Sequence, residues 1–323
     1  EQDLFEHYRF VADPGQGPLR IDKFLMGKIQ NASRNKIQQA AAAGSVLVND
    51  KAVKQNYKVK PNDVITIVLT EPPRDTEIIP ENIPIDIVYE DDDIMLVNKK
   101  AGMVVHPAYA NFTGTLVNAL SYYLQKQSGN DEAQPYLVHR IDKDTSGIIL
   151  VAKNELAQTR LAKEFFDHTI DRKYTALVWG DMEEDEGTIS GHLGRHRNNR
   201  KVMTVYPDGE TGKHAVTHWK VIKRFAYVTL IECILETGRT HQIRAHLKYI
   251  KHPLFNDAAY GGDQILKGTT FTKYRQFIKN CFAILPRQAL HARSLGLKHP
   301  ISGEYLFFDS ELADDMREVI VKW

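Results

Sequence analysis

Hydrophobic residues follow two different spacings along this chain, and each spacing predicts a type of element. Near the start, Ile21, Phe24, Leu25 and Ile29 recur every three or four residues, which predicts an amphipathic helix. Further along, most apolar runs are short and bounded by glycine or polar residues, as is typical of strands. Such strands are predicted at 85–91, 93–99, 136–142, 147–153, 173–180, 188–194, 214–224 and 227–236.

Helices are fewer. They are predicted at 114–124, at 155–169 after Asn154 as the N-cap, and at 239–250, and a terminal hairpin is predicted at 291–309. Because strands outnumber helices without regular alternation, the chain is expected to be of the α+β class. The predicted architecture is a large domain with a mixed or antiparallel central sheet and peripheral helices, preceded by a small α/β module.

The small module is expected to span residues 18–75, after an N-terminal extension at 1–17. Ser33 is the expected N-cap of its second helix, Gly44 the expected end of that helix, and Asn49-Asp50 the turn of a hairpin. Residues 76–85 are expected to be a linker because proline is excluded from helix interiors and central strands. The larger domain then covers 86–323.

Composition adds few constraints. The net charge is only +1, no apolar run reaches the ~20 residues of a membrane span, and no signal peptide is evident. Cys233 and Cys281 lie in apolar runs, which favours buried free thiols and a reducing compartment. We therefore expect a cytoplasmic protein without a membrane partner.

Two polar clusters are candidates for chemistry. HRIDKDTSG, residues 139–147, separates two apolar runs, and taken alone it could be a strand-to-strand turn with a surface ion pair. TGRTHQIRAH, residues 237–246, follows a predicted strand, with Thr240 as the expected N-cap of a helix. Arg244 lies in the first turn of that helix and is the candidate to point inward towards a carboxylate.

The first module resembles the alpha-L RNA-binding domain over LRIDKFL and SRNKIQQAAAAGSVLVNDKAV. The resemblance implies a structured RNA as the partner. Basic residues near the two predicted helix starts are the expected phosphate contacts, because helix N-termini carry positive potential. These residues are Arg20, Lys23, Arg34 and Lys36.

HRIDKDTSG, RKYTALVWG, TGRTHQIRAH and LHARSLGLKHP, in this order, resemble the pseudouridine synthases that act on large-subunit ribosomal RNA. The resemblance extends over about residues 18–310 and implies an isomerase that needs neither cofactor nor metal. It also implies that the enzyme acts as a monomer on ribosomal RNA, either free or in a pre-ribosomal particle. The chain departs from the family pattern at Lys100, Asn256 and Gly296-Leu297, all expected in turns or packing positions.

The resemblance also implies roles for single residues. Asp142 matches the catalytic aspartate, Tyr174 the tyrosine that packs on the target base, and Arg244 the basic partner of the aspartate. Arg140 matches an arginine that fills the RNA stack after the uridine has left. Lys248, on the basic side of the predicted helix, is expected to contact RNA phosphate.

Alternatives remain at this point. The chain could act on transfer RNA, or it could be a non-catalytic RNA-binding factor in ribosome assembly. An RNA methyltransferase is disfavoured because no glycine-rich loop follows a strand. A hydrolase using His139, Asp142 and Ser146 is disfavoured because a triad normally draws its side chains from separate segments.

Overall fold

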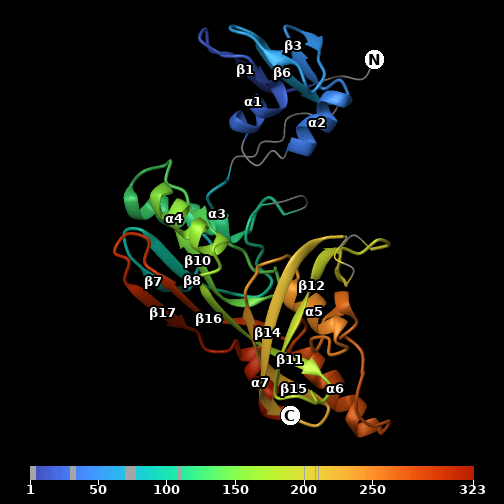
Figure 1. Cartoon of the computed structure of the whole chain (residues 1–323). Helices are drawn as coiled ribbons and strands as arrows, with labels where there is room; N and C mark the ends of the chain where they lie inside the picture. The colour runs from blue at the N-terminus through green and yellow to red at the C-terminus, as the bar shows by residue number, and fades with distance from the viewer. Residues whose placement is uncertain are drawn as a thin grey trace. The chain divides into compact units, whose positions relative to one another are not determined.

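The computed structural model describes residues 5–29, 34–69, 78–107, 111–199, 201–207, 209 and 211–323. The chain forms two compact units, residues 1–77 and residues 78–323. In Figure 1 the first unit is blue, and the second runs from cyan to red. Each unit has its own hydrophobic core, with that of the first unit built only from residues 10–67.

The first unit packs two helices, α1 (Ile21–Lys28) and α2 (Arg34–Ala42), against a four-stranded sheet. The strand order is β1-β6-β3-β4, and a separate pair joins β2 to β5. The bounds are β1 (Phe5–Val11), β2 (Leu19–Arg20), β3 (Val46–Val48), β4 (Lys51–Ala52), β5 (Lys58–Val59) and β6 (Val64–Leu69). Because β1 pairs with β6, the segment set apart as an extension contributes a strand to this sheet.

Local signals in the first unit were informative. Asn49 and Asp50 both have positive φ, 49° and 64°, as the predicted two-residue hairpin turn between β3 and β4 requires. Helix α2 ends before Gly44, whose φ is 76°. Ser33, its expected N-cap, lies outside the described residues.

The second unit is built on an eleven-stranded mixed sheet, which confirms the predicted fold class. The main strand order is β13-β12-β14-β15-β11-β16-β10-β8-β7, with β17 beside β16 and β9 beside β10. Only the β10–β16 pair is parallel among the described strands. The bounds are β7 (Ile87–Glu90), β8 (Ile94–Lys99), β9 (Tyr136–Leu137), β10 (Ser146–Ala152), β11 (Asp171–Trp179), β12 (Glu186–Arg195), β13 (Met203–Tyr206), β14 (Lys213–Arg224), β15 (Val228–Leu235), β16 (Leu290–Lys298) and β17 (Tyr305–Asp309).

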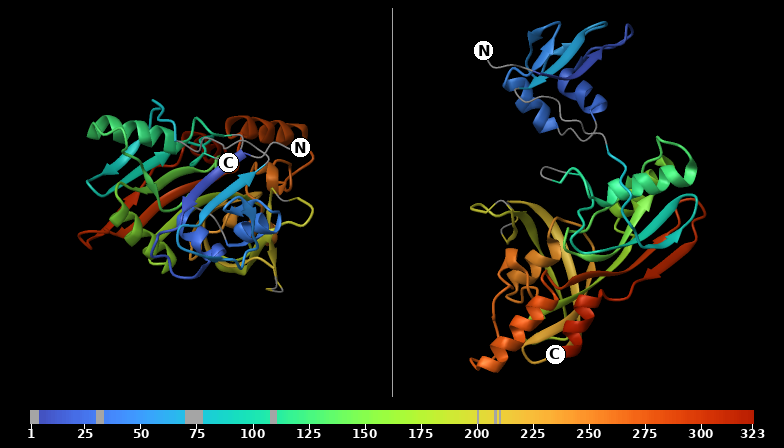
Figure 2. Two further views of the ribbon diagram at one scale, coloured as in Figure 1. Left: turned by 90° about the horizontal axis from the view of Figure 1, so that it is seen from above. Right: turned by 180° about the vertical axis from the view of Figure 1, so that it is seen from behind.

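Helices cover both faces of this sheet. On one face, α3 (Leu116–Ser128) and α5 (Gln242–Tyr249) pack on alternate residues of β8, β10, β11 and β15. On the other, α4 (Glu155–Phe166) packs near β10, whereas α6 (Thr272–Ile284) and α7 (Asp314–Lys322) pack on the far ends of β11 and β15. Figure 2 shows α6 and α7 side by side near the C-terminus. Burial on both faces explains why β10 is apolar at nearly every position.

Several expectations need correction. The predicted strand 136–142 is only the short β9, because the chain turns away after Leu137 and residues 138–145 form a loop. Helices α6 and α7 and strand β13 were not predicted. Cys233 and Cys281 are buried and free, as expected.

Candidate active site

Two buried basic side chains, Lys99 and Arg287, hold the loop at 138–145. Lys99, at the end of β8, is 1% exposed, and its Nζ donates to the carbonyl oxygens of Lys100, Met103 and Lys143. Burial lowers the pKa of Lys99 to about 7. Because one of these acceptors belongs to the loop, Lys99 fixes the backbone next to Asp142.

Arg287 supports the same loop from the other side. Its Nη1 donates to the carbonyl of Asp144 at 2.9 Å, and its Nη2 to the Ser146 hydroxyl at 3.1 Å. The guanidinium also forms two hydrogen bonds with Asp315 of α7, at 2.7 and 2.8 Å. The C-terminal helix therefore helps to hold the loop that presents Asp142.

Asp142 contacts Arg244 of α5. Nη1 of Arg244 donates to Oδ2 of Asp142 at 3.1 Å, so the structure brings together the two residues on which the predicted chemistry depends. The other side of the same guanidinium faces Asp257, with Nε to Oδ2 at 2.7 Å and Nη2 to Oδ1 at 2.9 Å. Asp257 is 1% exposed, whereas the side chain of Asp142 is 20% exposed and reaches the cavity.

The electrostatics of Arg244 favour a permanent charge. Burial opposes that charge, but the hydrogen bonds and proximity to Asp257 and Asp142 raise the pKa of Arg244 above its ordinary value. The guanidinium also lies 5.0 Å from the centre of the Tyr260 ring. The Asp142 carboxylate therefore lies beside a permanent cation.

Sequence reasoning missed Asp257. The sequence contains only a weak signal for Asp257, which directly follows Asn256, a position where the family pattern has glycine. Asn256 has a φ of 57°, and asparagine tolerates this left-handed backbone better than most residues. The turn places Asp257 at the N-terminus of the short 3-10 helix η1 (Ala258–Tyr260), facing Arg244.

The start of α5 also differs from expectation. The N-cap is His241 and not Thr240, and His241 adopts a left-handed backbone with φ of 53°. Its Nε2 lies 3.9 Å from Oδ2 of Asp142, and its Nδ1 lies 3.0 Å from the hydroxyl of Tyr260. A non-glycine residue in this conformation beside Asp142 is the kind of backbone strain that clusters at functional sites.

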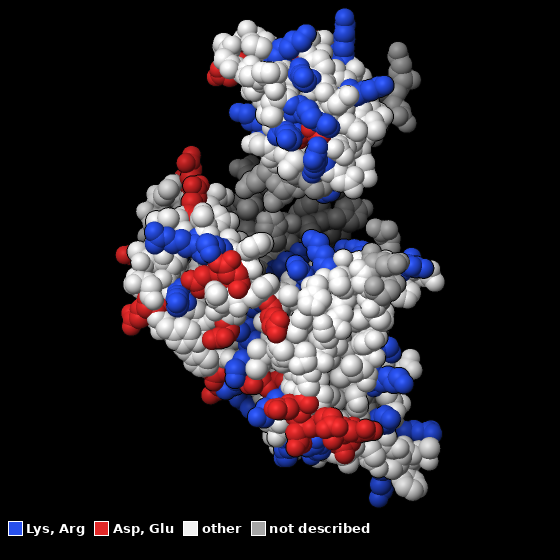
Figure 3. Space-filling view, in the orientation of Figure 1, with Lys and Arg blue, Asp and Glu red and all other residues white. Residues whose placement is uncertain are grey.

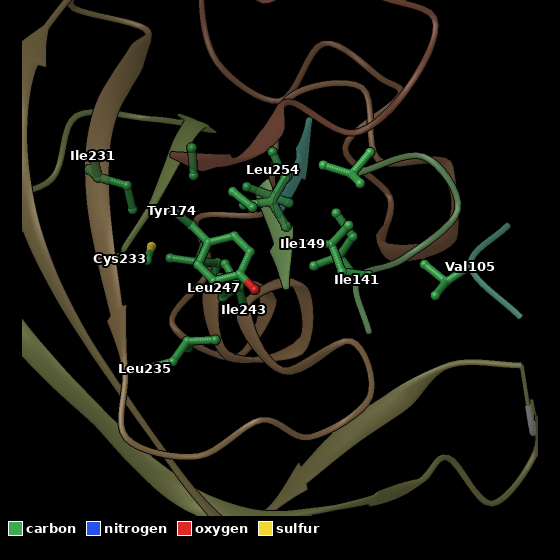
Figure 4. Packing of buried hydrophobic residues seen from close by; sticks show 14 of the residues in the cluster. Val105, Ile141, Ile149, Tyr174, Ile231, Cys233, Leu235, Ile243, Leu247 and Leu254 are labelled. Carbon is green, nitrogen blue, oxygen red and sulfur yellow. The ribbon is translucent and has the colours of Figure 1, made fainter. Parts of the chain in front are cut away.

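A cavity of about 460 Å³ opens beside Asp142. Tyr174, on β11, lines it, and Figure 4 shows the ring among Leu235, Ile243 and Leu247. Burial raises the pKa of Tyr174, although the nearby Arg172 partly opposes this shift, so the hydroxyl keeps its proton. The ring provides a flat apolar wall on which a base can stack.

A second cavity, of about 320 Å³, adjoins the first at Asp142. Arg140, Asp142, His241 and Arg244 line both cavities. Arg140 is exposed, which places a long cationic side chain at the edge of the site.

Comparison with known proteins identifies the family. Residues 93–249 match the model of the RNA pseudouridylate synthases, and residues 19–65 match the S4 domain. An "Uncharacterized RNA pseudouridine synthase" of Chlorobaculum parvum is 45% identical over 95% of this chain and 94% of its own length. The chain belongs to the RNA pseudouridine synthases. It is therefore an isomerase that acts on RNA, which confirms the predicted enzyme class.

Further comparisons agree with this assignment. The ribosomal large subunit pseudouridine synthase D of Zymomonas mobilis is 42% identical to this synthase, with 92% of each chain covered. Among solved structures, human RNA pseudouridylate synthase domain containing 4 has a TM-score of 0.57 at 20% identity, covering 73% of this chain and 92% of that one. The structural match supports the fold.

The hydrolase alternative does not fit the geometry of the synthase. The Ser146 hydroxyl forms a hydrogen bond with Nδ1 of His291 at 2.9 Å, so its histidine partner is His291 and not His139. Nε2 of His139 accepts the backbone N–H of Leu150, and burial lowers the pKa of His139 to about 3. Ser146 and His139 therefore have structural partners.

In the S4 unit, two predicted RNA contacts are also bound within the protein. Arg20 and Arg34 both donate to Asp22, with Arg20 Nη2 at 3.0 Å and Arg34 Nε at 3.1 Å. Asp22 is fully buried, which opposes its charge, yet hydrogen bonds from Gln38, Arg20 and Arg34 lower its pKa below the ordinary range. Both arginines stay partly exposed. The other predicted contacts, Lys23 and Lys36 in the same unit and Lys248 on α5, are exposed.

One group of described residues has the spacing of metal ligands: Asp91, Asp93 and His299. It is satisfied internally, because His299 Nε2 lies 3.0 Å from Oδ2 of Asp91 and Asn154 donates to Asp93. None of the three lines either cavity. No described helix is long and apolar enough to cross a membrane.

Proposed function

We propose that this synthase converts specific uridines of large-subunit ribosomal RNA to pseudouridine, with Asp142 as the reacting carboxylate. The observation that carries the proposal is the contact of Asp142 with Arg244 inside a cavity that Tyr174 also lines. Relatives named ribosomal large subunit pseudouridine synthase D, from Zymomonas mobilis and Vibrio vulnificus, support the ribosomal target.

The reaction requires little beyond a placed carboxylate. The bond from N1 of uracil to the sugar breaks, the base turns over, and carbon 5 bonds to the sugar instead. The hydrogen of carbon 5 leaves to solvent, and N1 gains one. Asp142 can attack the sugar or the base, or draw a proton from the sugar, and the cationic Arg244 lies beside it for any of these roles.

Access requires the uridine to leave its stack. A base inside a duplex cannot reach a side chain within a cavity, so the target must flip out of the helix. Tyr174 then stacks on the flipped base, and Arg140, exposed at the edge of both cavities, occupies the vacated space.

Binding to the rest of the RNA falls to basic residues outside the cavity. Lys248 on α5 and the exposed basic residues of the S4 unit contact phosphates; the latter are Arg20, Lys23, Arg34 and Lys36. On the face drawn in Figure 3, basic side chains predominate among the charged groups of the S4 unit, whereas acidic and basic side chains are interspersed on the other unit. The protein acts as a cytoplasmic monomer on ribosomal RNA.

The test is to map pseudouridines in the ribosomal RNA of cells that lack the gene. We expect specific large-subunit positions to revert to uridine, to be restored by the wild-type gene and not by Asp142→Asn. Losses confined to transfer RNA would overturn the ribosomal assignment, and restoration by Asp142→Asn would overturn the role of Asp142. Immunoblotting for equal protein levels is the control.

A further inference from the structure

Arg172 is a buried cation at the wall of the larger cavity. It lies on β11, two residues before Tyr174, and is 7% exposed. Both side chains line the cavity beside Asp142. Its position combines deep burial with access to the site.

No acidic partner accompanies Arg172. Among the described residues, none accepts a hydrogen bond from it, none forms an ion pair with it, and its buried Nε has no acceptor. The other buried arginines differ, because Arg244 binds Asp142 and Asp257, and Arg287 binds Asp315. An unpaired buried charge is strongly unfavourable, so proteins normally pair it.

The surroundings position Arg172 by stacking. Its guanidinium lies 5.3 Å from the centre of the Phe165 ring, and that ring stacks on His139 at 4.8 Å. Burial lowers the pKa of Arg172, and no carboxylate counteracts this effect. The aromatic groups hold the guanidinium but leave its charge uncompensated.

The turn after β15 leaves room for the same guanidinium. Gly238 packs so closely that a Cβ there would lie 2.8 Å from Nη1 of Arg172. Glycine at this position therefore permits the approach of Arg172 to the cavity wall. Phe165 and Gly238 thus accommodate the guanidinium, although no carboxylate among the described residues pairs with it.

We propose that Arg172 binds a phosphate of the RNA chain next to the uridine that enters the cavity. This inference rests on the proposed function, since it assumes that the cavity receives the target nucleotide. Uracil and ribose are neutral, so the phosphate is the part of the nucleotide that compensates the charge. The planar guanidinium also matches two phosphate oxygens with parallel hydrogen bonds. Arg172 binds substrate, and the reacting carboxylate remains Asp142.

The test measures binding separately from chemistry. In the full-length Asp142→Asn background, dissociation constants for a large-subunit ribosomal RNA transcript are measured over a range of KCl concentrations, with and without Arg172→Gln. Removing one phosphate contact should reduce the slope of log affinity against log salt by about 0.7 to 0.9. Lys173→Gln is the matched control, because Lys173 is the neighbouring residue on β11 and pairs with Glu232. An unchanged slope for Arg172→Gln, or an equal reduction for Lys173→Gln, overturns the proposal.

Thermal unfolding distinguishes a binding role from a structural one. Without RNA, Arg172→Met should melt at or above the temperature of the wild type, because it removes an uncompensated charge. Uridine 3′-monophosphate or 5′-monophosphate should raise the wild-type melting temperature more than uridine does, and Arg172→Met should abolish that difference. A lower melting temperature for Arg172→Met, or equal effects of nucleotide and nucleoside on the wild type, contradicts the proposal.

Turnover distinguishes this inference from the proposed function. With Asp142 intact, Arg172→Gln should raise KM by about tenfold or more and change kcat little, since a phosphate contact contributes to both ground and transition states. A wild type that forms no pseudouridine on ribosomal RNA overturns the proposed function alone, because the salt dependence still tests Arg172. Active wild type with an unchanged KM in Arg172→Gln overturns only the inference on Arg172.

Discussion

Arg244 bridges two carboxylates of different exposure, donating to Asp142 at 3.1 Å and holding Asp257 through two hydrogen bonds. Asp257 is fully enclosed and faces Nε and Nη2, so the orientation of the guanidinium is set before any substrate arrives. The remaining Nη1 is directed at Asp142. Asp257 is thus a positioning residue that acts on Asp142 through Arg244.

Asp257→Asn should therefore impair both stability and turnover. The substitution keeps the size of the side chain but removes the charge, so Arg244 loses a buried ionic partner at a cost of about 3 kcal/mol in the free energy of unfolding. We expect kcat to fall at least tenfold, measured with folded enzyme below its new melting temperature. Asp309→Asn, which affects an exposed pair with Arg293, is the control and should change neither. Wild-type kcat in Asp257→Asn would contradict the positioning role.

The sequence predicted Arg244 better than it predicted Asp257. Ile243, Leu247 and Ile250 define the apolar side of α5, so the inward direction of its first turn could be anticipated. Nothing in the spacing shows that Asp257, beyond the helix, folds back onto Arg244, because that contact depends on the left-handed turn at Asn256. The family motif marked Asp142, whereas Asp257 lies in no motif that the sequence analysis used.

The extent of the elements was harder to predict than their identity. Residues 136–142 have a strand-like composition, but tertiary contacts from Lys99 and Arg287 hold the segment after Leu137 as a loop. Helices α6 and α7 were not predicted, and each buries few residues, Ile278 and Cys281 in α6 and Met316 and Val319 in α7. In the sequence, Arg172 cannot be distinguished from an ordinary strand residue, because the lack of a carboxylate partner can be recognised only in the three-dimensional structure.

Gly147→Ala should disturb the sheet that carries the loop. Gly147 has a φ of 111°, and a Cβ there would lie 2.2 Å from the carbonyl oxygen of Ala292, its partner in the parallel β10–β16 pair. We expect a loss of about 3 kcal/mol in the free energy of unfolding, by urea titration, from overpacking and backbone strain together. Gly303→Ala is the matched control, because Gly303 has a φ of 75° but open space around it. That variant should lose only about 1 kcal/mol. Equal losses in both variants would contradict the packing argument.

Buried histidines should make the protein less stable in mild acid. Burial lowers the pKa of His246 and of His291 to about 4, from 6.5 in an exposed histidine. Between pH 6.5 and 4 the unfolded chain therefore binds more protons than the folded one, so stability is complete above pH 6.5 and falls as the pH falls. Each histidine contributes up to about 1.4 kcal/mol per pH unit.

The measurement is urea unfolding at pH 7 and pH 5.5 for the wild type and His246→Gln. The variant should lose less stability on acidification, because one of the buried neutral imidazoles is gone. His192→Gln, which replaces a partly exposed histidine of β12, is the matched control. The same pH dependence in the wild type and His246→Gln would show that His246 is not kept neutral by burial.

Removing the S4 unit should weaken RNA binding and spare the chemistry. A chain of residues 78–323 keeps the entire unit that contains Asp142, whereas it loses the basic residues of α1 and α2. Because a tethered module raises the local concentration of RNA, we expect KM on ribosomal RNA to rise at least tenfold with little change in kcat. An unchanged KM on long RNA would contradict this division of roles.

The central claim is that Asp142, held by Arg244, carries out the isomerisation. The most direct test is release of tritium from large-subunit ribosomal RNA labelled at carbon 5 of uridine, since that hydrogen leaves when carbon 5 bonds to the sugar. We expect release by the wild type, none above background by Asp142→Asn, and most of the wild-type release by Asp144→Asn, which removes a carboxylate two residues away. Tritium release by folded Asp142→Asn at the wild-type rate would contradict the account.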